Sequence, residues 1–145
     1  MTLTEDNYQE QINSYTHGEW LPLLELIPEI EKTRKFGEFI DVKPDENGVY
    51  SLGWNEYQII SRFRKVVYNM PIMISYDWMA WDEGRKIASD QDFDFDTIEI
   101  PTKCKLITAI VRNDRFCDGA LVSAFESGLI LKILKSIERQ VIRKP

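Results

Sequence analysis

The chain has 145 residues and a net charge of −6, with 43% hydrophobic and 29% charged residues. This length suits one domain around a single core, and we expect residues 1–145 to form one domain. No apolar run is long enough to span a membrane, and the acidic N-terminus lacks the apolar stretch of a secretory signal. The sequence therefore predicts a cytoplasmic protein without a membrane segment.

The charge is distributed unevenly along the chain. Residues 1–100 are strongly acidic, whereas residues 101–145 are net basic. Three interpretations remain open: attraction between the two parts across the fold, a simply solvated basic tail, or a basic face for an anionic partner.

Residues 4–34 have the pattern of helices. Thr4 is placed to cap a first helix, which would end at His17-Gly18. The apolar face of this helix would be formed by Tyr8, Ile12 and Tyr15. In the next helical stretch, Pro28 predicts a break, followed by two further turns. The apolar face of that stretch comprises Trp20, Leu23, Leu24 and Ile27.

The following segment favours strands. Two short β-type runs, Phe39–Val42 and Val49–Leu52, flank a turn-forming segment that contains Pro44 and Gly48. This arrangement predicts a minor β-hairpin near residues 39–52.

The middle of the chain combines helices with aromatic residues. Asn55 and Gln58 resemble a capping box that would open a helix over residues 56–68. Residues 72–76 are expected to be extended, and Asp77 is placed to cap the next helix. That helix would carry Trp78 and Trp81 one turn apart.

The C-terminal part predicts three helices after an acidic connector at residues 90–100. They would cover Lys103–Phe116, Gly119–Ser127 and Leu129–Ile142, with Gly128 in the left-handed position between the last two. The whole chain is thus expected to be mainly α-helical, a compact domain of about six helices with one minor hairpin.

Neither a metal site nor a cofactor is predicted. Cys104, Cys117 and the single histidine, His17, do not have the spacing of zinc ligands, and both cysteines are expected to be reduced and near the core. The aspartates of residues 90–96 imitate a calcium loop, but Phe95 occupies the position that requires glycine.

Candidate chemistry is concentrated at residues 105–126. On a helix, Lys105, Thr108, Arg112 and Arg115 would share one polar stripe. Two interpretations remain open: a solvated face whose arginines pair internally, or a site for an anion or an acidic partner. Three carboxylates lie nearby in the sequence: Asp114, Asp118 and Glu126. They are expected to be charge-paired rather than catalytic.

Two further features have structural and functional interpretations. The aromatic group that includes Trp78 and Trp81 is typical of a core, but also of a ligand pocket. The basic C-terminal helix could contact phosphates, but Leu129-Ile130-Leu131 at its start are unsuited to reading bases, so nucleic acid binding is not expected.

Two blocks of the sequence resemble DUF6508, an uncharacterised bacterial family of domains of unknown function. The first is Asp77-Trp78-Met79-Ala80-Trp81, and the second is the R-x-D-R-F-x-x-G…E-x-G pattern within Leu106–Gly128. The resemblance marks a set of signature positions in this chain, but it implies no activity and no catalytic residue. These positions are Arg112, Asp114, Arg115, Phe116, Gly119, Glu126 and Gly128.

The sequence favours a non-enzymatic binding or regulatory module whose partner is an acidic protein or a small anionic ligand. Its surface would comprise Lys105, Arg112, Asp114, Arg115, Asp118 and Glu126. The alternative is an enzyme or sensor that holds a small anion with Arg112 and Arg115, in a pocket near Trp78 and Trp81. A third is weak nucleic acid binding through the C-terminal helix. The oligomeric state is not predicted.

Overall fold

The computed structural model describes residues 3–41, 46, 52–117 and 119–143, with helices as the dominant element. The described residues contain four strands, which are β1 (Leu3–Thr4), β2 (Gly37–Asp41), β3 (Leu52–Glu56) and β4 (Ile74–Ser75). Their α-helices are α1 (Tyr8–Asn13), α2 (His17–Leu24), α3 (Ile27–Lys32), α4 (Gln58–Asn69), α5 (Asp82–Ser89), α6 (Ile100–Asn113), α7 (Ala120–Glu126) and α8 (Leu129–Arg143). Two 3-10 helices are present, η1 (Trp78–Ala80) and η2 (Phe95–Thr97). The mainly α class with one small antiparallel hairpin is therefore confirmed.

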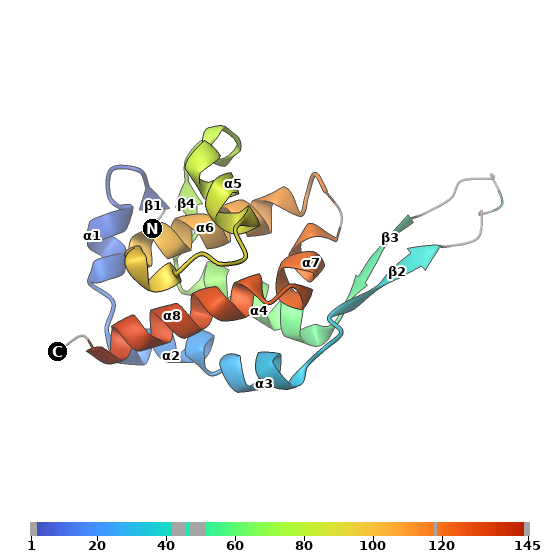
Figure 1. Ribbon diagram of the computed structural model, residues 1–145, viewed down its shortest axis with the longest axis horizontal. Helices are drawn as coiled ribbons and strands as arrows, with labels where there is room; N and C mark the ends of the chain where they lie inside the picture. The colour runs from blue at the N-terminus through green and yellow to red at the C-terminus, as the bar shows by residue number, and fades with distance from the viewer. Residues whose placement is uncertain (1–2, 42–45, 47–51, 118, 144–145) are drawn as a thin grey trace.

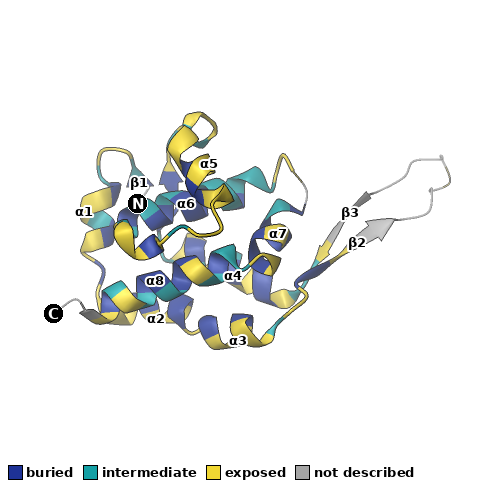
Figure 2. Cartoon of the chain, in the orientation of Figure 1, coloured by how far each residue is buried: buried dark blue, intermediate teal, exposed yellow. Residues whose placement is uncertain are grey.

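Helix α8 lies across the helical body and contacts α2, α3, α6 and α7 (Figure 1). Its apolar residues recur every three or four positions, which places them on one face, and that face is buried (Figure 2). The buried residues of this face are Ile130, Ile133, Leu134, Ile137 and Val141. The apolar face of α8 is thus used for packing within the chain.

The N-terminal segment differs from its prediction in two respects. Thr4 does not cap a helix, because Leu3–Thr4 pairs in parallel with Ile74–Ser75. His17 begins α2 rather than ending α1, since Thr16 and Glu19 form a reciprocal capping box. The predicted apolar stripe is confirmed, since Tyr8 and Ile12 of α1 and Tyr15 just after it are all buried.

Pro28 marks the break between α2 and α3, as predicted. Helix α2 ends at Leu24, and α3 begins at Ile27 with Pro28 in its first turn. A proline is tolerated there because the first turn of a helix has no carbonyl partner for its N–H groups.

The hairpin is confirmed, with its second strand further along the chain than predicted. Strands β2 and β3 pair antiparallel from Gly37 opposite Glu56 to Asp41 opposite Leu52, and they extend away from the helical body (Figure 1). Much of the predicted strand Val49–Leu52 and its turn lie outside the described residues. Asn55 belongs to β3 and does not cap α4, because the backbone pairing continues to a bond from the N–H of Tyr57 to the carbonyl of Phe36, 2.9 Å long.

The tryptophans of the first signature block lie on a tight turn rather than within one α-helix. Hydrogen bonds from the N–H of Ala80 to Asp77 and from that of Trp81 to Trp78, both 3.3 Å, form η1. Asp77 makes no side-chain cap, and α5 begins only at Asp82. Trp78 thus stands on η1 and Trp81 at the junction with α5.

The three C-terminal helices follow the predicted order, and glycines shape their connections. Gly119 and Gly128 have φ angles of 87° and 85°, in the left-handed region predicted for Gly128. Cys104 is buried as expected, whereas Cys117 is exposed, and both are free thiols.

Ion pairs join the acidic and basic parts of the chain. The Nε of Arg139 lies 3.0 Å from Asp96 of η2, and the Nζ of Lys135 lies 3.4 Å from Glu31 of α3. These contacts agree with the interpretation that the two parts attract each other, although such exposed pairs contribute little to stability. Within the described residues, no helix is both long and apolar enough to cross a membrane.

Candidate functional site

The residues of the predicted polar stripe on α6 lie in different environments. Thr108 is fully buried: its hydroxyl accepts a hydrogen bond from the N–H of Ile74 at 3.1 Å and donates one to the carbonyl of Cys104 at 2.9 Å. Arg112 donates from Nη1 to the carbonyl of Ile74 at 2.6 Å. Both side chains therefore attach α6 to β4, and the guanidinium of Arg112 already has a role in the fold.

Lys105 lies among aromatic rings. Its Nζ is 4.7 Å from the ring centre of Trp81, 4.8 Å from that of Tyr76 and 6.0 Å from that of Tyr8. The ammonium is attracted to the negative faces of these rings. Tyr76 is fixed in turn, because its hydroxyl donates to the carbonyl of Lys105 at 2.7 Å, and burial raises the pKa of this phenol. Lys105 therefore helps to position Trp81.

The two described carboxylates of the predicted surface also stabilise the fold. Asp114 accepts hydrogen bonds from the N–H of Leu121 at 3.0 Å and from Nη2 of Arg64 at 2.6 Å. Arg64 also pairs with Glu56 of β3, so this cluster links the hairpin, α4, α6 and α7. Farther along, Glu126 accepts a 3.3 Å bond from the N–H of Phe36, just before β2.

Arg115 and Glu126 are both exposed, and Asp118 lies outside the described residues. Among the described residues, no carboxylate lies within ion-pair distance of Arg115. The signature arginines therefore differ in their roles: Arg112 binds the backbone of β4, and Arg115 faces solvent.

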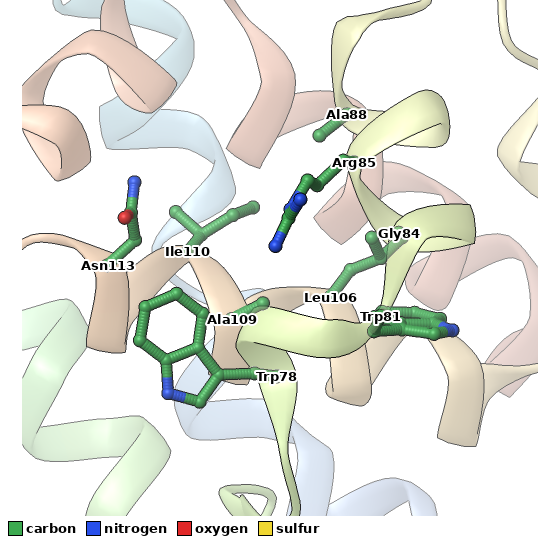
Figure 3. Close-up of a pocket in the computed structure, with 9 residues that line it drawn as sticks. All are labelled: Trp78, Trp81, Gly84, Arg85, Ala88, Leu106, Ala109, Ile110 and Asn113. Carbon is green, nitrogen blue, oxygen red and sulfur yellow. The ribbon is translucent and has the colours of Figure 1, made fainter.

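A pocket of about 320 Å³ brings together the two predicted tryptophans between η1, α5 and α6. In Figure 3 the side chain of Arg85 points from α5 toward α6, between the indoles of Trp78 and Trp81. Asn113 lies at the end of α6 beside Trp78. The remaining lining is small or apolar and consists of Gly84, Ala88, Leu106, Ala109 and Ile110.

The chemistry of this lining suits a partly apolar anion. Indoles and aliphatic side chains provide flat apolar walls, while the guanidinium and the Asn113 amide provide hydrogen-bond donors. The side chain of Arg85 is 65% exposed, and its contact within the chain is a 3.5 Å approach to Asp82 one turn earlier. Such an exposed pair is weak, so the guanidinium can reorient toward a ligand at little cost.

Gly84 fits the close approach of α5 to Trp81. A Cβ atom at this position would overlap the indole, whereas one at Gly18 would lie 3.9 Å from its nearest neighbour. We expect Gly84→Ala to destabilise the protein by about 1–2 kcal/mol through overpacking. In urea unfolding, Gly18→Ala serves as the matched control and should be neutral or slightly stabilising. Equal stability of the two variants would contradict the tight Gly84–Trp81 packing.

From the sequence, Trp78 and Trp81 could belong to a core or to a ligand pocket, and the polar residues of this pocket were not predicted. Arg85 comes four residues after Trp81, a spacing that does not by itself distinguish a pocket residue from an exposed arginine. Asn113 follows Leu106, Ala109 and Ile110 at helical spacing, so these four residues lie on one side of α6. Among the described residues, no group of three or more histidines, cysteines or carboxylates is placed to hold a metal ion.

Comparison with known proteins gives one family. Residues 15–143 match the family described as "Family of unknown function (DUF6508)". No curated protein and no solved structure matches the chain. The match covers α2 to α8, including the pocket and the residues around Asp114. The chain therefore belongs to the DUF6508 family.

Proposed function

We propose that this protein is a non-enzymatic binding module of the cytoplasm that takes a small anion with a planar apolar body. The ligand occupies the pocket between η1, α5 and α6. The observation that carries this proposal is the meeting of Trp78, Trp81 and Arg85 around one space. In this proposal Arg85 binds the anion, in place of Arg112 and Arg115.

The size of the pocket limits the ligand. A volume of about 320 Å³ is at the lower end of the range for small-molecule sites. A body of one or two fused rings fits this space, since the indoles offer flat faces or edges for aromatic contact. A carboxylate on such a body would accept hydrogen bonds from Arg85, whose planar fork matches its geometry.

The test uses pairs of ligands that differ only in charge, such as naphthoate with naphthamide. We expect the wild-type protein to bind the carboxylate about fivefold more tightly than the amide, which corresponds to about 1 kcal/mol for a partly exposed charge pair. Arg85→Met should reduce this preference to near unity. Dissociation constants from ligand-detected NMR titrations provide the measurement.

The control for this experiment is Lys86→Met, which removes the neighbouring exposed cation on α5 but does not alter the lining. This variant should retain the preference for the carboxylate. An unchanged preference in Arg85→Met would show that Arg85 does not select the anion. Failure of both ligands to bind wild type would contradict an aromatic-anion site in this pocket.

A further inference from the structure

An exposed aromatic surface adjoins the pocket on the side where α6 passes into α7. Phe116 is 68% exposed and Met79 is 47% exposed, although both are large and hydrophobic. The Phe116 ring rests against the indole of Trp78, with centres 5.9 Å apart. We call Trp78 and Phe116, together with their exposed chain neighbours Met79 and Arg115, the Phe116 surface. A grouping of apolar side chains of this kind is typical of an interaction site rather than of scattered surface residues.

The backbone under Phe116 is held in place. The N–H of Arg115 donates to the carbonyl of Arg112 at 3.2 Å, and that of Phe116 donates to the carbonyl of Asn113 at 3.0 Å. Just before them, Asp114 is fixed by Arg64 and by the N–H of Leu121. The turn therefore presents Arg115 and Phe116 in a defined direction, which lowers the conformational entropy lost on binding.

The charge of the surface selects its partner. The guanidinium of Arg115 is exposed, and the neighbouring carboxylate of Asp114 is already engaged with Arg64. Arg85 adds a second guanidinium at the pocket that Trp78 also lines (Figure 3). Arginine and aromatic residues are the side chains that most often dominate the binding energy of protein interfaces. A complementary partner presents apolar side chains next to a carboxylate.

We propose that the Phe116 surface docks an acidic segment of a partner protein, with an apolar side chain against Phe116 and Trp78 and a carboxylate on Arg115. This inference goes beyond the proposed ligand site, because it requires Arg115 and Phe116 and does not require an occupied pocket. Trp78 is shared by both features, so a ligand that moves this indole will alter the docking surface.

The test is selection of random linear peptides displayed on phage against the full chain. Wild type should enrich peptides that combine Asp or Glu with a nearby Leu, Ile, Phe or Trp. With one enriched peptide made synthetically, Phe116→Ser should weaken binding about tenfold or more, as for a central interface aromatic. Arg115→Glu should weaken it similarly, and should restore binding to a version of the peptide whose acids are replaced by lysine.

Two matched variants control for general surface effects. Ile142→Ser removes another exposed apolar side chain at the end of α8, and Arg34→Glu reverses another exposed arginine. Both should bind the selected peptide like wild type. The proposal would be overturned if no class of acidic and apolar peptides is enriched, or if Phe116→Ser binds the selected peptide as wild type does. Binding to phosphatidylserine vesicles in place of peptides would also overturn it. Measuring naphthoate binding by Phe116→Ser shows whether the pocket is intact in this variant. A loss of peptide binding can then be distinguished from a failure of the proposed ligand site.

Discussion

Asp114→Ala is expected to lower the free energy of unfolding by about 2–3 kcal/mol. The variant removes the acceptor for the N–H of Leu121 and one of the two carboxylates that bind Arg64. The side chain of Asp114 is only 11% exposed, so water cannot fully replace these bonds. Leaving a buried donor unpaired costs about 1–3 kcal/mol, and the partly buried guanidinium adds to this cost.

Urea unfolding followed by circular dichroism measures this effect. Asp114→Asn should lose about half as much stability, because an amide oxygen still accepts the bond from Leu121. Asp82→Ala provides the control, since its side chain is 79% exposed and should change stability by less than about 0.5 kcal/mol. If Asp114→Ala were as stable as this control, the Arg64–Asp114 cluster would not be the junction of the hairpin and the helices.

Lys103 should make stability depend on pH. Its side chain is fully buried, its ammonium donates to Gln140, and burial lowers its pKa to about 8. Burial is the largest cause of this shift; Asp96 and Asp94 act to raise the pKa of Lys103, and Arg139 acts to lower it. Folding therefore moves this ammonium into a place that disfavours its charge.

The sign of the effect follows from proton binding. Between about pH 8 and 10.5 the unfolded chain keeps the Lys103 proton that the folded chain has released, so this residue makes stability rise with pH. The full effect on the free energy of unfolding is about 3 kcal/mol, and below about pH 8 the buried charge of Lys103 destabilises the folded protein by this amount. Cys104 opposes the trend above its normal pKa, because burial raises the pKa of its thiol.

Comparison of Lys103→Met with wild type tests the lysine, because the buried thiol of Cys104 is present in both proteins. The stability of the variant relative to wild type should be about 2–3 kcal/mol more favourable near pH 7 than near pH 10. Loss of the bond to Gln140 affects both conditions alike and does not change this difference. A relative stability that stays constant with pH would contradict a charged, destabilised Lys103.

The local part of the fold could be predicted from the sequence. The stripe of Tyr8, Ile12 and Tyr15, the break at Pro28 and the left-handed Gly128 all depend on residues within a few positions of one another. The assignment of Thr4 failed because its backbone pairs with Ser75. A contact over such a separation leaves no trace in local spacing, and tertiary pairing outweighs the capping preference.

The candidate site, too, could be predicted only where it depends on local spacing. Helical spacing correctly placed Thr108 and Arg112 on one face of α6, but it could not show that β4 covers this face and engages both side chains. The tryptophans could be named as pocket candidates from their type, although the same type also suits a core. Arg85 could not, because an exposed arginine on an amphipathic helix has the same pattern whether or not a pocket lies beside it.

The proposed binding of an aromatic anion between Trp78 and Trp81 can be followed at the two indoles themselves. The experiment records the indole N–H signals of the protein in proton–nitrogen correlation spectra during a naphthoate titration, with each signal assigned by single Trp→Phe replacements. We expect saturable shifts of the Trp78 and Trp81 signals, no shift of the buried Trp20 signal, and weaker shifts in Arg85→Met. Unmoved Trp78 and Trp81 signals, or shifts centred on Trp20, would contradict it.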